Sequence, residues 1–364
     1  MKVALVPDYL DEYGGAERTF EVFCEMFPQA EVFTLLYNPL KMPSKINQMR
    51  INISPYFQRL PNFIKKNRFL LVHKFPLAIE NFDLSDFDLV ISSGSFSKGL
   101  IIKPETIHIF YCHRLMRSLW EKHAEFIDEQ RGFLKKIYIR YQTKKLRIWD
   151  FLAADRPDYI IANSYYTQKQ ISKFYRRESK VIYPPINLSE FKVNKEREDY
   201  YLMVTRLGPF DKVDLAIRAF NELGKHLVII GDGPLKKDFQ KLAGKNIDIL
   251  GYKPPEVLVE YYASAKGFIS LGEETFGLAE VEAMASGTPI IAYKKGGVKE
   301  TVIAGESGEF FDNLSVREII KAVNFVEKNY SRYDHYKIRS LVEKFDKKHF
   351  KEELESFIQE VVNK

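Results

Sequence analysis

The sequence has few cysteines and no long apolar run. Its 364 residues include two cysteines, Cys24 and Cys112, which excludes a small disulfide-held domain and fits a reducing compartment. No stretch of eighteen apolar residues occurs, so no membrane-spanning helix is predicted. The apolar run at 3–6 is broken by Pro7 and Asp8, which favours a first strand over a secretory signal. We therefore expect a cytoplasmic protein.

Acidic residues are missing from two basic stretches. Residues 32–79 contain no Asp or Glu but eight Lys/Arg between Lys41 and Lys74, and residues 131–147 contain seven Lys/Arg and no acid. The first stretch also holds Tyr56, Phe57, Phe63, Phe69 and Phe75, and the second holds, at helical spacing, Phe133, Leu134, Ile137, Tyr138 and Tyr141. Such stretches suit a peripheral position on an anionic membrane, or a lipid-linked phosphate acceptor. For either stretch taken alone, a solvated helix with one core face is the simpler explanation. No nucleic-acid-binding motif occurs, so nucleic acid is not an expected partner.

Short apolar runs alternate with helical patterns along the chain, which is typical of parallel sheets covered by helices. The predicted strands are 3–6, 31–36, 87–93, 107–112, 158–163 and 180–183, and then 200–205, 226–230, 247–250, 268–271, 290–293 and 309–311. Between the two sets, Pro184-Pro185 and the polar run 194–199 suit a hinge. We expect an α/β protein with Rossmann-like domains at 1–188 and 189–345 and a terminal helix at 346–364, because the length suits two domains.

The segment 268–293 combines a strand, a turn, a helix and a second strand. The helix is expected to begin near Gly277 and to stop at Gly287, shortly before Pro289. At about 100° per residue, Glu282 lies near the apolar face of this helix and Glu280 points away from it. A buried unpaired carboxylate is costly, so Glu282 should have a partner, either a structural cation or the hydroxyls of a ligand. An ordinary crossover helix with one paired acid is the simpler alternative.

The run Glu274-Thr-Phe-Gly-Leu-Ala-Glu-Val-Glu282, with Gly287-Thr-Pro289 behind it, resembles the donor-site signature of retaining glycosyltransferases with the GT-B fold. These form the large group 1, or family 4, with many mannosyltransferases. The resemblance covers nearly the whole chain and is densest from 200 to 312. It implies two Rossmann-like domains facing across a cleft, with a terminal helix that crosses back to the first. It also implies a retaining hexosyltransferase that needs no metal and no cofactor besides its nucleoside diphosphate sugar.

The same resemblance assigns a donor site to the second domain. Glu274 would meet the sugar and Glu282 the ribose hydroxyls, while Arg206 and a lysine would hold the diphosphate. The other donor-binding residues that it implies are Gly231, Asp232, Thr275, Phe276, Gly277 and Leu278. The chain departs from the family order Arg-Leu-x-Pro-x-Lys, because Asp211 stands where lysine is usual and Lys212 follows it. We expect Lys212 to reach the diphosphate and Asp211 to cap the next helix.

Two groups of the first domain complete the predicted site. The turn Gly14-Gly15 comes before a helix, where free N–H groups suit an anion, although a plain turn is the simpler alternative. It is similar to the family loop that faces the donor diphosphate. His113 follows a predicted strand, at the edge where open α/β sheets bind ligands, and its context resembles the family stretch whose histidine contacts the sugar. Asp86-Phe-Asp88 precedes a strand, so no metal site is expected there.

The sequence therefore predicts a transferase that moves a hexose from a nucleotide sugar to a saccharide or a lipid-linked saccharide. GDP-mannose is the leading donor, because the contexts of His113 and of Gly14-Gly15 look most like mannosyltransferases of polysaccharide assembly, and a UDP-sugar comes second. A sugar-nucleotide epimerase or a non-catalytic sugar-nucleotide-binding subunit remain as alternatives. A dehydrogenase is disfavoured, because no Gly-x-Gly-x-x-Gly follows a strand.

Overall fold

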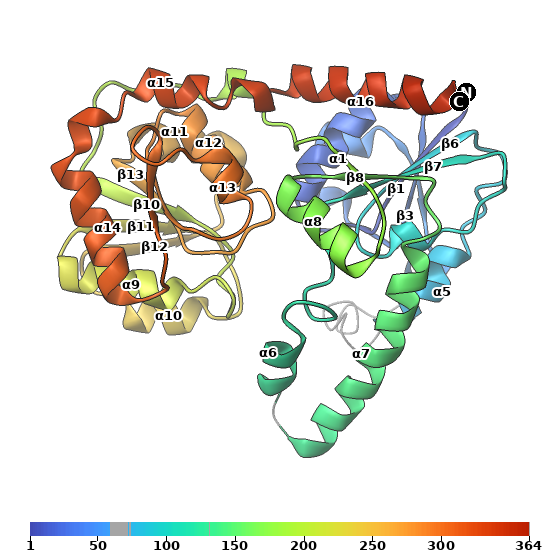
Figure 1. Ribbon diagram of the computed structural model, residues 1–364, viewed down its shortest axis with the longest axis horizontal. Coiled ribbons are helices and arrows are strands. Elements are labelled where there is room, and N and C mark those ends of the chain that lie inside the picture. The colour runs from blue at the N-terminus through green and yellow to red at the C-terminus, as the bar shows by residue number, and fades with distance from the viewer. Residues whose placement is uncertain (59–71, 73, 131, 364) are drawn as a thin grey trace. The chain divides into compact units, whose positions relative to one another are not determined.

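The computed structural model describes residues 1–58, 72, 74–130 and 132–363. They form two compact units. Unit 1 consists of Met1–Tyr183 and Lys351–Lys364, and unit 2 of Pro184–Phe350. Each unit is a parallel sheet with helices on its faces (Figure 1). The domain ends predicted after residues 188 and 345 both fall inside unit 2.

Unit 1 is built on a seven-stranded parallel sheet in the order β5-β3-β1-β6-β7-β8-β9. Its strands are β1 Val3–Pro7, β3 Glu31–Thr34, β5 Arg50–Ile53, β6 Leu89–Ser93, β7 Ile107–Cys112, β8 Tyr159–Ala162 and β9 Lys180–Val181, and a separate pair is β2 Tyr9–Leu10 with β4 Leu36–Tyr37. Every residue of β1 and β6 is buried, as expected of parallel strands covered on both faces. The two strands pair from Val3 with Leu89 to Pro7 with Ser93.

The last helix of the chain belongs largely to unit 1. The α-helices among the described residues of this unit are α1 Gly15–Met26, α2 Ser44–Asn47, α3 Pro55–Gln58, α5 Phe75–Glu80, α6 His123–Asp128, α7 Phe133–Ala153, α8 Tyr165–Phe174 and the greater part of α16 Lys347–Val362. In α16, Phe357 packs edge-on against Tyr159 of β8, with ring centroids 5.9 Å apart. Lys351 forms an ion pair of 2.7 Å with Glu25 of α1. These contacts confirm that the terminal helix returns to the first domain.

Unit 2 repeats the architecture with a six-stranded parallel sheet in the order β12-β11-β10-β13-β14-β15. Its strands are β10 Tyr200–Val204, β11 His226–Ile230, β12 Ile247–Gly251, β13 Gly267–Ser270, β14 Ile290–Tyr293 and β15 Gly308–Phe311. Its helices are α9 Val213–Leu223, α10 Lys236–Leu242, α11 Pro255–Ser264, α12 Leu278–Ala285, α13 Val298–Thr301, α14 Val316–Lys328 and α15 His335–Ser340. The predicted α/β class with two Rossmann-like domains is confirmed.

Each sheet reverses its strand order at one point. In unit 1 the chain starts at β1, adds β3 and β5 on one side, and then adds β6 on the other. In unit 2 it starts at β10, adds β11 and β12, and then crosses to β13. Open α/β sheets bind ligands beyond the carboxyl ends of the strands at such a switch point. The topology therefore directs attention to the loops that follow β1 and β6, and to those that follow β10 and β13.

The described part of the first basic stretch lies partly in the core and partly on the surface. Phe57 and Phe75 are buried, with ring centroids 4.9 Å apart. Lys45 is paired with Glu25 of α1, and Arg50 with Glu31. Its described part therefore supplies core packing and partly paired charge, and the membrane interpretation of that part stays a prediction. Phe63, Phe69, Arg59, Lys65, Lys66 and Arg68 lie outside the described residues.

Candidate active site

The loops after β10 and β11 pack backbone to backbone in unit 2. Leu207 N donates to Asp232 O over 3.0 Å, and Thr205 N donates to Ile230 O over 3.0 Å. Gly231 has φ 147°, and a Cβ there would lie 1.8 Å from Thr205 O. Only glycine suits that position, because other residues avoid this conformation and would collide with the carbonyl. The close packing places the loop that carries Arg206 beside the loop that carries Asp232.

Arg206 and Asp232 present opposite charges at this end of the sheet. Both side chains are exposed. Asp232 accepts hydrogen bonds from Gly233 N, at 2.9 Å, and from Lys236 Nζ, at 3.1 Å. The bond from Lys236 is the main reason that the pKa of Asp232 is lowered. Asp232 is therefore an ionised carboxylate at neutral pH, suited to accept hydrogen bonds from hydroxyl or amine groups of a ligand.

The start of α9 differs from its prediction. The helix begins at Val213, and its N-cap residue is Lys212, which has a left-handed φ of 53° and makes no side-chain cap hydrogen bond. Asp211 precedes the N-cap position and lies against Gly208, where a Cβ would come 3.0 Å from Oδ2 of Asp211. The prediction that Asp211 is the N-cap is therefore wrong, and the acid in the first turn is Asp214. Lys212 is half-buried, and no carboxylate of the described residues lies within ion-pair distance of it.

The loop after β13 carries Glu274 and leads into α12. Glu274 O accepts a hydrogen bond of 2.7 Å from Gly297 N, in the loop that follows β14. Thr275 and Phe276 are buried, and the ring of Phe276 packs edge-on against Phe345 at 5.0 Å. This loop is thus held at both ends, and it leaves Glu274 half-buried at the carboxyl end of β13. Gly277 is the N-cap of α12, and the helix begins at Leu278, as predicted.

Glu280 does not point away from the core, and that prediction is wrong. Its side chain is 3% exposed, and Oε1 accepts a hydrogen bond from the hydroxyl of Ser270 at the end of β13. Burial raises the pKa of Glu280 to about 7, and the charges of Glu274 and Glu282 add to the shift. The error arose because α12 is buried on all sides over residues 280–285, so a one-faced helical wheel does not apply to it. Glu280 is an acid near its midpoint at neutral pH, next to the proposed donor residues.

Glu282 is buried as predicted, but its partner is different. The hydroxyl of Tyr262, in α11, donates to Oε2 of Glu282 over 2.8 Å, and the two side chains are 1% and 4% exposed. A tyrosine thus provides part of the hydrogen bonding that we had expected from a cation or a ligand. The assignment of Glu282 to the ribose hydroxyls stays a prediction.

In unit 1, Gly14 and Gly15 stand at the start of α1, as predicted. Gly14 is the N-cap, and its N–H donates to Oε2 of Glu17 over 2.9 Å. The carboxylate of Glu17 therefore already occupies part of the helix end that we had assigned to the donor diphosphate. A second anion at that point would meet repulsion from Glu17. The contact of Gly14 and Gly15 with the donor stays a prediction.

His113 follows β7 and is held by the neighbouring strand. Its Nε2 lies 2.9 Å from Oγ of Ser93, the last residue of β6, and its ring packs edge-on against Tyr111 at 4.9 Å. Burial lowers the pKa of His113 to about 4. The imidazole is therefore neutral at physiological pH and can exchange hydrogen bonds with a sugar, but it brings no positive charge to a departing diphosphate.

Asp86 and Asp88 lie before β6, at the opposite end of the strand from His113 and Ser93. Both pair with the amino-terminal residues: Lys2 Nζ is 3.8 Å from Asp86, and Lys2 N donates to Asp88 over 2.6 Å. This placement agrees with the prediction of a strand entry. Within the part of the chain that the structure describes, no group of three or more His, Cys, Asp or Glu side chains is arranged to hold a metal ion.

Each unit has a parallel sheet covered by helices, and the loops at its switch point carry polar and glycine residues that suit ligand binding. This arrangement is that of a protein with two Rossmann-like domains of the GT-B type. The family "Glycosyltransferase Family 4" matches residues 13–190, and "Glycosyl transferases group 1" matches residues 186–358. The chain belongs to this group 1, or family 4, of glycosyltransferases. The family identification from the sequence is confirmed.

Relatives and solved structures agree with this assignment. An uncharacterized glycosyltransferase of Methanocaldococcus jannaschii is 30% identical over 161 residues, 43% of this chain and 46% of that protein. A GDP-mannose-dependent alpha-(1-6)-phosphatidylinositol monomannoside mannosyltransferase of Mycolicibacterium smegmatis is 31% identical over 138 residues, 33% of this chain and 36% of that protein. The chain thus spans less than half the length of these relatives. Among structures, Anabaena HepE in complex with UDP has a TM-score of 0.74 at 15% identity and covers 99% of this chain and 100% of its own.

Proposed function

We propose that this protein transfers a hexose from a nucleoside diphosphate sugar to a saccharide or a lipid-linked saccharide acceptor. The observation that carries the proposal is the switch point of unit 2. There β10 and β13 are neighbours, and the loops that follow them carry Arg206 and Glu274. The guanidinium of Arg206 can bind phosphate, and the carboxylate of Glu274 can bind sugar hydroxyls. Both therefore lie at the same edge of the sheet, in loops that follow neighbouring strands. Family membership supports transfer as the reaction.

GDP-mannose is the donor that we propose first. The mannosyltransferase of Mycolicibacterium smegmatis carries GDP-mannose in its name, and the contexts of His113 and Gly14-Gly15 point the same way. A UDP-sugar is the second candidate, because Anabaena HepE is described in complex with UDP and with UDP-glucose. A lipid acceptor is supported by the alpha-monoglucosyldiacylglycerol synthase of Streptococcus pneumoniae, which is 26% identical over 270 residues, 64% of this chain and 58% of that protein.

We further propose that transfer retains the anomeric configuration and needs no metal. Arg206 and Lys212 would stabilise the departing diphosphate, as preorganised positive groups do. Glu274 would hold the sugar and Glu282 the ribose. His113 would act through hydrogen bonds alone, because it is neutral. The leaving phosphate itself would take the proton of the acceptor, as the family resemblance implies.

Membrane association is proposed through α7, the helix of the second basic stretch. Eight large apolar residues of this helix are exposed, Phe133 at 77% and Leu134 at 80%. The others are Ile137, Tyr138, Tyr141, Ile148, Phe151 and Leu152. The side that packs against the rest of unit 1 consists of the buried residues Ile139, Thr143, Leu146, Asp150 and Ala153. At about 100° per residue the exposed set lies roughly opposite the buried set. The helix therefore has a core side and a second, outward apolar side.

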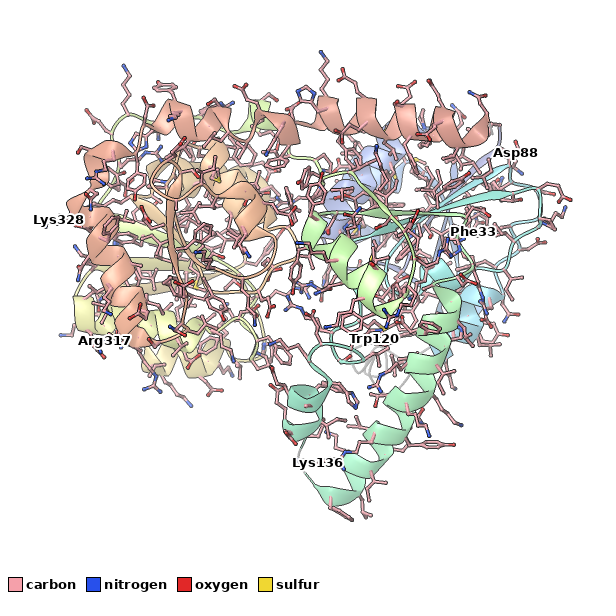
Figure 2. The ribbon with its side chains drawn as sticks, in the orientation of Figure 1. Phe33, Asp88, Trp120, Lys136, Arg317 and Lys328 are labelled. Atoms are coloured by element: carbon pink, nitrogen blue, oxygen red, sulfur yellow. The ribbon has the colours of Figure 1, made fainter. Side chains whose placement is uncertain are left out.

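The charges of α7 favour an anionic lipid surface as the partner of this outward side. Every charged residue of the helix before Asp150 is Lys or Arg, and Asp150 is buried. Lys145 lies over the ring of Tyr141 at 4.6 Å, and Lys136 marks the amino-terminal end, away from the sheet of unit 1 (Figure 2). A second copy of α7 would bring like charges together. Lipid head groups neutralise them while the acyl region accepts the apolar side chains. No helix among the described residues is long and apolar enough to cross a bilayer.

A thermal-shift screen followed by a turnover assay tests the transferase proposal. A nucleotide sugar that binds the folded state raises the melting temperature, and we expect GDP-mannose to give the largest rise. Turnover with that donor is then measured with and without EDTA. We expect activity in both, and loss of activity that Mg²⁺ or Mn²⁺ restores would contradict metal independence. Binding without turnover on any acceptor would favour the non-catalytic subunit, and donor isomerisation without acceptor would favour the epimerase.

A further inference from the structure

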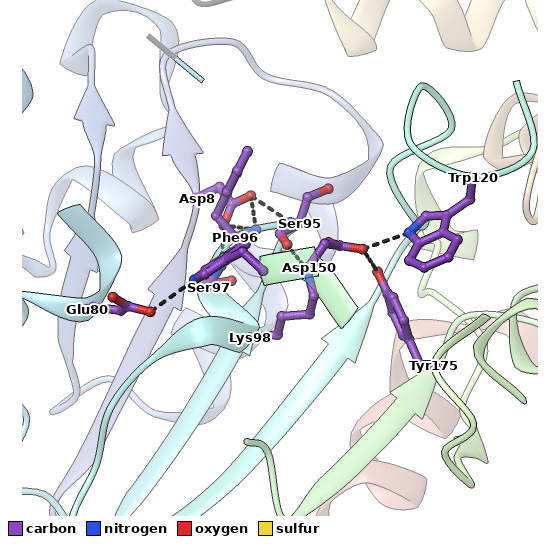
Figure 3. Close-up of polar contacts among 10 residues, drawn as sticks. Asp8, Glu80, Ser95, Phe96, Ser97, Lys98, Trp120, Asp150 and Tyr175 are labelled. Carbon is purple, nitrogen blue, oxygen red and sulfur yellow. Dashed lines mark hydrogen bonds and ion pairs between the residues drawn. The ribbon is translucent and has the colours of Figure 1, made fainter. Parts of the chain in front are cut away.

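At the carboxyl end of β1, three consecutive backbone N–H groups hold the buried carboxylate of Asp8. Ser95 N donates to Oδ2 over 2.6 Å, and Ser97 N donates to Oδ1 over 2.7 Å. Phe96 N lies 2.9 Å from Oδ2 and 3.1 Å from Oδ1. Figure 3 shows the carboxylate against this turn. Successive N–H groups that converge on one point form an anion-binding nest, so this nest is filled by a carboxyl group of the protein itself. Burial raises the pKa of Asp8, and the hydrogen bonds from Phe96, Ser97 and Ser95 oppose that shift.

The nest lies at the switch point of unit 1, between β1 and β6, where an open α/β sheet binds its ligand. Gly94 precedes Ser95 with φ 153°, and a Cβ there would lie 2.3 Å from Cγ of Asp8. The carboxylate therefore fills the space in front of β6 that a ligand phosphate would need. The backbone of Asp8 is fixed as well, because its N–H donates to Ser93 O over 3.3 Å.

A buried ion pair continues from the nest. Lys98 and Asp150 are 1% and 0% exposed, and Nζ of Lys98 lies 2.6 Å from Oδ1 of Asp150. Lys98 also donates to the carbonyl of Ser95, inside the nest turn. The other oxygen of Asp150 accepts from Trp120 Nε1 at 2.7 Å and from Tyr175 OH at 2.9 Å (Figure 3). The carboxylate of Asp150 is thus satisfied at both oxygens, so the pair is held in one geometry.

Both predicted site segments of unit 1, the one with the catalytic candidate His113 and the one with the donor-binding turn Gly14-Gly15, are connected to this network. His113 is hydrogen-bonded to Ser93, the last residue of β6, which comes immediately before Gly94 and the nest. The segment that follows His113 is tied down at Trp120 by Asp150. The segment that leads to Gly14-Gly15 starts at Asp8 and includes the short strand β2. Each of the two segments therefore has one anchor in the network.

We infer that Asp8 is a positioning residue for the proposed transfer: its carboxyl group fills the nest of residues 95–97 and fixes the segments that carry His113 and Gly14-Gly15. The inference rests on the proposed function for the reaction that is positioned.

Chemical rescue of Asp8→Ala tests the inference. Removing the carboxylate empties the nest, and formate is a small anion that fits it. We expect millimolar formate to raise the melting temperature of Asp8→Ala and to leave the wild type and Asp86→Ala unchanged. Asp86 is a matched control, because it is an exposed acid before β6. A formate effect of equal size in all three proteins, or none in Asp8→Ala, would overturn the filled nest.

Kinetics separate positioning from mere stability. At a temperature well below melting, we expect Asp8→Ala to lose about tenfold or more in kcat, with the donor Kd from calorimetry unchanged and kcat partly restored by formate. Asp8→Asn keeps one acceptor oxygen and should lie between Asp8→Ala and the wild type; it also serves if Asp8→Ala does not fold. An unchanged kcat, or a loss of donor affinity that explains the whole effect, would overturn the positioning role. A wild type without turnover on any donor would overturn the proposed function and this role together, whereas the melting experiment still reports on the nest alone.

Discussion

The hydroxyl of Tyr262 donates a hydrogen bond of 2.8 Å to Oε2 of Glu282, and both side chains are buried in unit 2. Glu282, which the family resemblance assigns to the ribose, is therefore hydrogen-bonded to a residue of the neighbouring helix α11. A carboxylate fixed in this way loses little freedom when it binds a ligand, so it is preorganised. Substitutions of the two residues can therefore distinguish an effect on stability from an effect on donor binding.

Glu282→Gln is expected to weaken donor binding and to leave the fold intact. The amide oxygen of Gln can still accept from Tyr262, but hydrogen bonds to a charged acceptor, which contribute roughly 1.5–3 kcal/mol, become neutral ones. Calorimetry with the preferred donor measures the loss. Tyr262→Phe is the matched control, because it should lower stability and change donor affinity less. An unchanged Kd for Glu282→Gln would rule out the ribose contact.

Lys212→Asn is expected to lower kcat by orders of magnitude. Asn removes the positive charge and tolerates the left-handed conformation at this position, so any loss reflects charge rather than backbone. Asp211→Asn, next to it, should cost little, because Asp211 does not hold the N-cap of α9. Steady-state rates of the two variants with one donor provide the comparison. A silent Lys212→Asn with a large gain from Asp211→Lys would point to a weakened transferase.

Glu280 is expected to make unit 2 less stable as the pH rises from about 4.5 to about 7. The folded state keeps the proton of Glu280 to a pKa of about 7, whereas an ordinary Glu releases it near 4.5. The folded state thus binds more protons in this window, and the free energy of unfolding falls with pH. Glu280→Gln should remove this trend and gain up to about 3 kcal/mol at pH 8 over pH 4.5, relative to the wild type. Urea unfolding of both proteins across this range would contradict the assignment if the two curves ran parallel.

The outward side of α7 is expected to bind anionic vesicles by two separable contributions. Phe133→Ser with Leu134→Ser should reduce co-sedimentation at low and at high salt, because full burial of such a side chain contributes roughly 1.5–3 kcal/mol. Lys144→Glu with Lys145→Glu should reduce it mainly at low salt, since salt screens the charges. Phe325→Ser, an exposed aromatic of α14, is the control and should change nothing. Equal binding to neutral and anionic vesicles would exclude the proposed surface.

The strands were predictable because each is a short apolar run between polar turns. The predicted strand at 226–230 coincides with β11, and the one at 290–293 with β14. A strand buried on both faces is a continuous apolar run, so it can be predicted from its own residues without knowing which strands it pairs with. The surroundings of the basic stretch that includes Phe57 and Phe75 were harder to predict, because the acids that pair with its basic residues, Glu25 and Glu31, lie outside the stretch in the sequence.

The candidate site was predictable only where it is local in sequence. The loop from Glu274 to Gly277 follows a strand and precedes a helix, so its place at the sheet edge was evident. The role of Asp8 was not, because its N–H donors come about 90 residues later and are backbone groups, which leave no trace in the side-chain pattern. Glu280 was missed for another reason: a helix of eight residues that is buried on all sides has no amphipathic signal to read.

The position of α16 bears on the order in which the protein is made. Residues 351–364 belong to unit 1 although they follow the whole of unit 2 along the chain. During synthesis, which proceeds from the amino terminus at about 5–20 residues per second, Pro184–Phe350 leaves the ribosome before the piece of unit 1 that carries Phe357. Unit 2 can therefore complete its fold first. Unit 1, although translated earlier, must wait with part of its surface uncovered until α16 emerges.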